Sequence, residues 1–297
     1  MIERREMILA LAGAGLAAGL SAAAGLARAK PDPAVLSRRL QSLEARSGGR
    51  LGVSIIDTGG GLRLRHRSQE RFPMCSAFKV LAAACVLARV DGGQETLGRR
   101  IAYDASELIF YSPATKPHAG AGMTLGELCE AAVTLSDNTA ANLVLKQIGG
   151  PKGLTAWLRS IGDATTRLDR WEPELNTAIP GDPRDTTTPD AMAETLRSLV
   201  LRRALSDESR AILAGWMVAC QTGGARLRAG LPAGWRVGDK TGTSADKAGT
   251  SNDVALVWRP DGRTAVITAF LTRATPDGKA RDAILAEVGK IAAESLA

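Results

Sequence analysis

The sequence predicts a split α/β fold, in which strands near both ends of the chain form one domain and an all-helical domain is inserted between them. Segments 51–57 and 62–67 alternate apolar and polar residues around a glycine-rich turn, and strand signals return at 235–243, 254–258 and 264–273. From Phe72 to about Trp216 the pattern is mainly helical. We therefore assign residues 30–67 and 218–297 to the α/β domain and residues 68–217 to the helical domain.

The helices are located by their periodicity and by start and stop signals. An amphipathic helix is expected over Pro33–Ser47. Within the helical domain, Thr124 and Glu127 precede an apolar run at the spacing of a capping box. The helical pattern over 140–150 ends in two glycines, which predict the end of a helix. A last helix is expected from about Lys279 to Ser295.

The composition is that of a globular protein, since 45% of the 297 residues are hydrophobic and 23% are charged. The net charge of +7 is spread along the chain without a basic block, and only 4% of the residues are aromatic. Both observations argue against nucleic-acid binding.

Residues 1–29 have the pattern of an export signal: Arg4 and Arg5, an uncharged run over 7–27, and a small-x-small sequence ending at Ala29. The run is long enough to span a bilayer, so an uncleaved anchor is the alternative. Its alanine and glycine content favours cleavage after Ala29 and no stable membrane anchor. The paired arginines indicate twin-arginine export, with the general secretory route as the alternative. A periplasmic or secreted protein is expected.

Two polar residues lie three positions apart at the start of the apolar run within segment 72–90, namely Ser76 and Lys79. Residues at this spacing are neighbours on a helix, so the two side chains can touch. In one interpretation Ser76 caps the helix and Lys79 extends to water. In the other, Lys79 activates Ser76 as a nucleophile. A thiol nucleophile at Cys75 is a further alternative, but the two histidines of the chain, His66 and His118, supply no evident partner for it.

Three further segments carry chemically active side chains: Ser136-Asp137-Asn138 between helical runs, Lys240-Thr241-Gly242-Thr243 on a predicted strand, and Glu172 with Asn176 in a loop rich in proline and glycine. Taken singly, each has a structural explanation. These explanations are a helix N-cap at Asn138, a surface strand, and a solvated acidic loop.

Together the segments resemble the motif set of class A serine β-lactamases and penicillin-binding proteins, with Ser-x-x-Lys at 76–79, Ser-Asp-Asn at 136–138 and Lys-Thr-Gly at 240–242. Residues 167–185 resemble the class A omega loop, and the resemblance covers essentially the whole mature chain. It implies an antiparallel sheet flanked by helices, an inserted helical domain, a monomer, no cofactor and no metal.

The resemblance also implies a reaction, the hydrolysis of penicillins and cephalosporins through an acyl-enzyme on Ser76, giving antibiotic resistance. Either neutral Lys79 or Glu172 acting through a water takes the serine proton, a choice that is disputed for the family. Ser136 passes a proton to the leaving lactam nitrogen. The backbone N–H groups of Ser76 and Thr243 form the oxyanion hole.

Glu172 separates a hydrolase from a penicillin-binding protein, which stays trapped as its acyl-enzyme. By resemblance, Glu172 and Asn176 hold the water that releases the product. A D-alanyl-D-alanine peptidase and a β-lactam-sensing receptor domain are the alternatives, and Glu172 argues against both. Pro173 allows a cis peptide after Glu172. Arg170 and Asp185 either close the base of the loop as an ion pair, again by resemblance, or form a solvated surface pair.

The resemblance assigns substrate binding to a set of cleft residues: Tyr111, Asn138, Asn176, Lys240, Thr241, Gly242 and Thr243. Many relatives add an arginine on the strand after Lys-Thr-Gly to hold the substrate carboxylate. That strand has none here, so Arg226 is expected to replace it. Arg228 is expected to point to the opposite side of an extended segment.

The four cysteines, Cys75, Cys85, Cys129 and Cys220, match no zinc-binding spacing and are expected to be small buried residues. Carbapenem-hydrolysing relatives pair a cysteine at the position of Cys75 with one just after Lys-Thr-Gly. Ser244 stands at that second position, so this disulfide cannot form and broad carbapenem activity is not expected. A bridge between Cys85 and Cys129 is left open, because Cys85 is displaced by two residues from the family position.

Overall fold

The computed structural model describes residues 32–202, 204–244 and 248–297. The predicted export signal, residues 1–29, lies outside the described residues. Within them, no helix has both the length and the apolar character needed to cross a membrane.

The described residues form the following α-helices: α1 (Pro33–Ser47), α2 (Phe78–Asp91), α3 (Leu125–Thr134), α4 (Asn138–Gln147), α5 (Gly150–Ser160), α6 (Pro189–Leu201), α7 (Asp207–Val218), α8 (Leu227–Gly230) and α9 (Gly278–Leu296). The strands are β1 (Arg50–Asp57), β2 (Arg63–His66), β3 (Phe72–Pro73), β4 (Arg100–Ile101), β5 (Met123–Thr124), β6 (Thr186–Thr187), β7 (Arg236–Thr243), β8 (Ser251–Trp258) and β9 (Thr264–Thr272). Two 3-10 turns matter for the site, η1 (Cys75–Ala77) and η4 (Glu174–Thr177).

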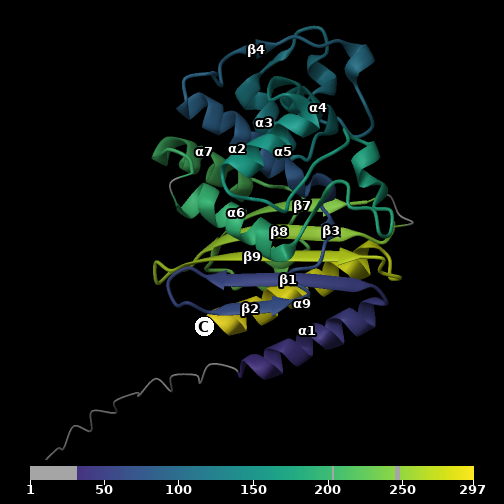
Figure 1. Ribbon diagram of the computed structural model, residues 1–297, viewed down its shortest axis with the longest axis vertical. Helices are drawn as coiled ribbons and strands as arrows, with labels where there is room; N and C mark the ends of the chain where they lie inside the picture. The colour runs from purple at the N-terminus through teal and green to yellow at the C-terminus, as the bar shows by residue number, and fades with distance from the viewer. Residues whose placement is uncertain (1–31, 203, 245–247) are drawn as a thin grey trace, which may run out of the picture.

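The main sheet joins the two ends of the chain. It is antiparallel, with the strand order β2-β1-β9-β8-β7, and β1 pairs with β9 along its whole length. Figure 1 shows these strands stacked from β7 at the top to β2 at the bottom, with α2 to α5 above β7. The predicted antiparallel α/β fold is confirmed.

The two faces of the sheet are covered by different helices, because alternate residues of a strand point to opposite faces. On one face Ile55 and Ile267 pack in a cluster with residues of α1 and α9. On the other face Ile56 and Val266 join the core that continues through α2 to α7. In Figure 1, α6 crosses in front of the strands and α9 passes behind them. The helical part therefore shares one continuous core with the sheet.

Strand β8 begins three residues before the predicted segment 254–258, at Ser251. The polar run Ser251-Asn252-Asp253 lies outside that segment, but all three residues are almost fully buried. They belong to the strand because their side chains find partners inside the protein. Asn252, for example, donates to the Pro73 carbonyl oxygen at 2.9 Å.

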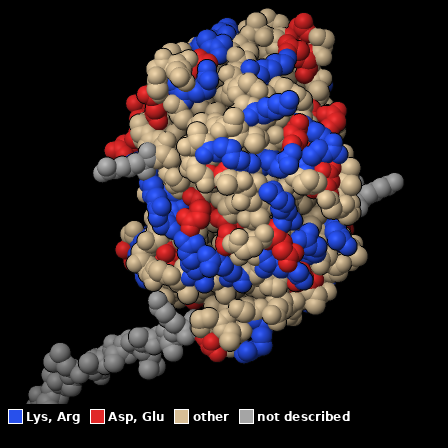
Figure 2. Space-filling view, viewed as in Figure 1, with Lys and Arg blue, Asp and Glu red and all other residues tan. Residues whose placement is uncertain are grey.

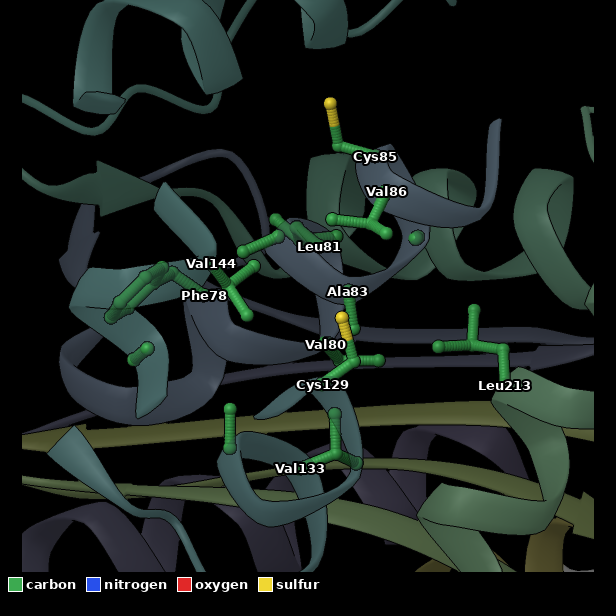
Figure 3. Close-up of a cluster of buried hydrophobic side chains, with 14 of the residues drawn as sticks. Phe78, Val80, Leu81, Ala83, Cys85, Val86, Cys129, Val133, Val144 and Leu213 are labelled. Carbon is green, nitrogen blue, oxygen red and sulfur yellow. The ribbon is translucent and has the colours of Figure 1, made fainter. Parts of the chain in front are cut away.

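Helix α2 is the centre of the helical core, and every residue from Phe78 to Leu87 is buried. Figure 3 shows Phe78, Leu81 and Val86 of this helix among side chains from neighbouring helices, with Cys85 and Cys129 in the same cluster. All four cysteines are buried and free, so the structure contains no Cys85–Cys129 disulfide. Burial raises the pKa of the Cys85 thiol to about 12 and that of the Cys129 thiol further.

Activity and stability are therefore expected to be independent of any disulfide. Thiol titration of the unfolded protein should count four free cysteines, whereas the folded protein should react slowly because its thiols are buried and protonated. Comparing thermal unfolding with and without reductant checks this. A loss of several kcal/mol on reduction, the size expected for a native disulfide, would contradict it.

Candidate active site

The segment that carries Ser76 turns directly from strand β3 through η1 into α2. Helix α2 begins at Phe78, and neither Ser76 nor the N-cap residue Ala77 makes a side-chain capping bond. Lys79 is 0% exposed, so it does not extend to water. The interpretation of this pair as a helix cap and a solvated lysine is therefore wrong. Cys75 is also a poor nucleophile, because burial raises the pKa of its thiol.

One carboxylate oxygen connects the serine and the lysine. The Ser76 hydroxyl donates to Glu172 Oε1 at 3.2 Å, and Lys79 Nζ lies 3.1 Å from the same oxygen. Lys79 Nζ also donates to the Ser136 carbonyl oxygen at 2.8 Å and to Asn138 Oδ1 at 2.6 Å. The structure thus brings these sequence-predicted residues into one hydrogen-bonded group.

The lysines of the site are poised to change protonation state. Burial lowers the pKa of Lys79, and the negative charge of Glu172 opposes this effect. Burial, reinforced by the positive charge of Lys79, lowers the pKa of Lys240 to about 7. Both ammonium groups therefore release a proton more readily than a solvated lysine does.

Ser136 lies between the two lysines. Its hydroxyl accepts from Lys240 Nζ at 3.0 Å and from Lys79 Nζ at 3.5 Å. The backbone of Ser136 is in the left-handed region at φ 61°, which is unfavourable for a residue with a side chain. Such strain is tolerated where the surroundings hold it, as at functional sites.

The residue that caps α4 is Asp137, so the alternative of an N-cap at Asn138 is wrong. The Asp137 side chain accepts from the backbone N–H of Ala140 at 2.8 Å and from that of Thr115 at 2.9 Å. Asn138 is the first residue of the helix, and its Nδ2 donates to the Phe110 carbonyl oxygen at 2.9 Å. It thereby connects the loop at the mouth of the site to Lys79.

The Glu172 side chain is 0% exposed, and its carboxylate is held from several sides. Asn176 Nδ2 donates to Glu172 Oε2, and the Oδ1 atom of Asn176 is buried with no partner among the described residues. The Glu172–Pro173 peptide bond is cis. Asn142, which sequence analysis missed, fixes the Glu172 backbone with one bond to its N–H at 3.0 Å and one to its carbonyl at 2.9 Å.

The omega loop is closed by a buried ion pair. Arg170 Nε donates to Asp185 Oδ2 at 2.6 Å, and Asp185 is 0% exposed. Asp185 Oδ1 also accepts from the backbone N–H groups of Asp169 and Arg170. The alternative of a solvated surface pair is therefore wrong.

The opposite wall of the site is strand β7. A Cβ atom on Gly242 would overlap the Met74 carbonyl oxygen, so only glycine lets β7 pass this close to the serine turn. Asn252 of the next strand donates to that same carbonyl oxygen at 3.0 Å. Sequence analysis assigned no role to Asn252.

Arg226 reaches the end of β7 from outside the sheet. It is 8% exposed, and its Nη2 donates to Thr243 Oγ1 at 2.8 Å. Its Nε donates to Asp282 at 2.7 Å, which orients the guanidinium group. The expected position of Arg226 beside the Lys-Thr-Gly strand agrees with this geometry.

The expectation for Arg228 is wrong, because residues 227–230 form the short helix α8 and not an extended segment. The backbones of α8 and α9 pack so closely that a Cβ atom on Gly230 would overlap the Ala286 carbonyl oxygen. In this helix Arg228 turns inward and pairs with the buried Asp239 at 3.1 Å.

These elements enclose a cleft of about 390 Å³. It is lined by Ser76, Phe110, Tyr111, Ser136, Asn138, Pro173, Asn176, Thr222, Arg226, Thr241, Gly242, Thr243 and Ser244. Phe110 is 83% exposed and Tyr111 is 49% exposed, so two aromatic rings stand at its mouth. Lys79, Glu172 and Lys240 lie beneath the lining. The cleft can accept a small anionic ligand and present a serine hydroxyl to it.

Comparison with known proteins gives a consistent result. Residues 35–296 match the model of the "Beta-lactamase enzyme family". Beta-lactamase OXY-2 of Klebsiella oxytoca is 49% identical over 261 residues, covering 88% of this chain and 89% of that protein. Beta-lactamase AST-1 of Nocardia asteroides is 49% identical over 263 residues, covering 89% of this chain and 84% of that protein. Among solved structures, the ancestral (GNCA) class A β-lactamase has a TM-score of 0.85 and 62% identity, covering 86% of this chain and 98% of that one.

Proposed function

The chain belongs to the class A β-lactamase family and hydrolyses β-lactams, an activity that confers antibiotic resistance, and we propose that it does so through an acyl-enzyme on Ser76. The observation that supports this assignment is the convergence of the Ser76 hydroxyl and the Lys79 ammonium on one oxygen of Glu172. Locating a trapped penicillin on Ser76 by peptide mass spectrometry tests it.

In the acylation step, Ser76 Oγ attacks the lactam carbonyl carbon and its proton passes to Glu172, to which it is already hydrogen-bonded. The bond from the carbonyl carbon to the lactam nitrogen then breaks. Ser136 donates a proton to that nitrogen and is resupplied by Lys79 or Lys240, both within hydrogen-bond distance of its hydroxyl. The backbone N–H groups of Ser76 and Thr243 hold the developing oxyanion.

Before deacylation, the serine proton leaves Glu172 through Lys79, 3.1 Å away, and replaces the proton that Ser136 gave to the lactam nitrogen. Glu172 then takes a proton from the water that attacks the ester carbonyl carbon, and it returns this proton to Ser76 Oγ as the ester C–O bond breaks. Asn176 supports this role because it holds the carboxylate through Nδ2 and keeps a buried acceptor, Oδ1, without a partner among the described residues. Asn142 fixes the backbone position from which the carboxylate acts. The cleft thus holds a base for each half of the reaction.

The charge of Lys240 is expected to set an alkaline limit on kcat/KM. With its pKa at about 7, Lys240 is cationic below that pH and attracts the substrate carboxylate, and it loses this charge as the pH rises. An arginine at this position keeps its charge. The profile of kcat/KM against pH should fall above about pH 7 in the wild type, and the fall should move up by about 2 units or more in Lys240→Arg. If kcat/KM of Lys240→Arg falls at the same pH as in the wild type, the alkaline fall belongs to another group.

Arg226→Ala is expected to lower kcat/KM for carboxylate-bearing β-lactams about ten- to hundredfold, because it removes a charge-assisted bond worth roughly 1.5–3 kcal/mol. Arg226→Lys should recover only part of the lost kcat/KM, since lysine lacks the planar guanidinium group with its paired N–H donors. Steady-state kinetics on a β-lactam and on its methyl ester isolate the effect on the carboxylate. The ester should respond little to Arg226→Ala.

Arg228 is unsuitable as the control because it pairs with buried Asp239. Arg236 is a better control, because it is exposed at the start of β7, is stacked 4.8 Å over the Trp258 ring and does not line the cleft. Its replacement by alanine removes the same charge as Arg226→Ala. Arg236→Ala should leave kcat/KM nearly unchanged. Equal losses on the acid and the ester in Arg226→Ala would show that Arg226 only supports the strand.

We also propose that residues 1–29 are a cleaved export signal and that the mature enzyme acts in the periplasm or outside the cell as a monomer. The basic start, the apolar run and the small-x-small sequence ending at Ala29 support this. Sequencing the mature N-terminus should begin at Lys30. We retain residues 30–67 with 218–297, and residues 68–217, as the two proposed domains.

A further inference from the structure

A second cavity, of about 140 Å³, lies between the omega loop and one end of the main sheet, and it shares no lining residue with the catalytic cleft. Its walls come from omega-loop residues 170, 175 and 178–184, from the segment that enters β3, and from the first residue of β1 and the last of β9. Chain segments far apart in the sequence thus form one recess.

The walls are strongly basic. They include five arginines and one carboxylate residue: Arg50, Arg71, Arg170, Arg184, Arg273 and Asp182. Figure 2 shows basic side chains across the middle of the face in view, with acidic ones between them. Three of the arginines are neutralised locally, in the pairs Arg50–Glu70, Arg170–Asp185 and Arg184–Asp182.

Two of the arginines have no carboxylate partner among the residues described. Arg71 Nη1 donates only to the Thr165 carbonyl oxygen at 3.0 Å and to Thr186 Oγ1 at 3.1 Å. The Arg273 side chain makes no hydrogen bond or ion pair within the described part of the chain. Its backbone N–H donates to the Ala248 carbonyl oxygen at 3.0 Å, which anchors the residue where β9 ends.

We propose that this cavity binds a small phosphate-bearing anion between Arg71 and Arg273. The two uncompensated guanidinium charges match a phosphate, which carries about −1.5 to −2 charges at neutral pH, better than a single carboxylate. The planar donors of arginine fit phosphate oxygens in pairs. A cavity of 140 Å³ accommodates an anion of the size of phosphate or diphosphate.

The site is connected to the omega loop through Leu175. This residue is 1% exposed, lines the cavity, and lies in η4 next to Asn176. An anion bound there contacts the back of the segment that carries the deacylating pair. Because it binds only the folded protein, it should raise the melting temperature and slow amide hydrogen exchange within residues 174–184.

The test uses the whole mature enzyme, with inorganic phosphate and diphosphate compared against sodium chloride at equal ionic strength. Saturating diphosphate should raise Tm by about 4 °C in the wild type. Arg273→Gln should lose this shift and keep the wild-type kcat/KM without the anion, since the Arg273 side chain makes no hydrogen bond or ion pair among the described residues and does not line the catalytic cleft. Arg38→Gln, an exposed arginine of α1, removes the same charge and should keep the shift.

A second arm distinguishes a free phosphate from a lipid headgroup. Vesicles of phosphatidylglycerol should co-sediment with the wild type and not with Arg273→Gln if the phosphate belongs to a lipid. A Tm shift with diphosphate alone assigns the site to a soluble anion. The proposal is overturned if the wild type shows neither the Tm shift with diphosphate nor co-sedimentation with the vesicles. It is also overturned if the wild type and Arg273→Gln show these effects equally.

Discussion

Replacing Glu172 by alanine is expected to trap the enzyme as an acyl-enzyme on Ser76 and to lower kcat by about a thousandfold or more. The change removes the only carboxylate that the Ser76 hydroxyl and Lys79 share in the structure described. Without that charge, burial is opposed only by the smaller effects of Asp137 and Cys75, so the pKa of Lys79 falls further. A neutral Lys79 can then accept the serine proton, so acylation continues while nothing activates water on the ester.

Mass spectrometry of the variant after mixing with penicillin checks this result, and the adduct should lie on the peptide that contains Ser76. Glu174→Ala is a matched control, because Glu174 is an exposed carboxylate two residues further along the same loop. It should turn over substrate like the wild type. Rapid turnover by Glu172→Ala, with no adduct accumulating, would mean that another group is the deacylating base.

Ser76→Ala is expected to abolish both half-reactions, with kcat reduced by about 10⁴-fold or more, since it removes the hydroxyl that is hydrogen-bonded to Glu172. The neighbouring thiol offers a direct comparison. Cys75 is fully buried and burial raises its thiol pKa, so it should not substitute for the serine. Cys75→Ala should therefore retain most of the activity. Loss of activity in Cys75→Ala, with the wild-type adduct mapped by fragmentation to Cys75 and not to Ser76, would restore the thiol alternative.

The fold and the central residues were accessible from sequence because they depend on local patterns. The strands of the main sheet follow the alternation of apolar and polar residues, and Ser76, Lys79 and Glu172 lie in recognisable motifs. The register that brings β1 against β9 depends on pairing between the two ends of the chain, and no local pattern specifies it.

Residues that hold the site in place were harder to predict. Asn142 and Asn252 act through backbone groups more than 25 residues away in the sequence, so their own neighbours give no signal. Asn142 does lie one helical turn after Asn138, a spacing that puts both side chains on the same face. Arg228 was misplaced because the tight packing of α8 on α9 favours a helical turn where the sequence suggested an extended segment.

The charges of the cleft suit an anionic substrate. Lys79, Lys240 and Arg226 bring three cationic groups to the site, where Lys79 is paired with Glu172 and Arg226 with Asp282. A substrate carboxylate near Lys240 and Arg226 relieves the repulsion between Lys240 and Lys79 that helps to lower the pKa of Lys240. Substrate binding should therefore return Lys240 to its charged form.

The central claim is that Glu172 turns an acylating serine site into a hydrolase. It is tested most directly by counting the product released from a chromogenic cephalosporin by known amounts of the wild type and of Glu172→Ala. The wild type should continue far beyond one equivalent at a constant rate, and Glu172→Ala should release one equivalent and nearly stop. A wild-type reaction that stops after one equivalent would contradict the claim, because it is the behaviour of a sensor or a peptidase.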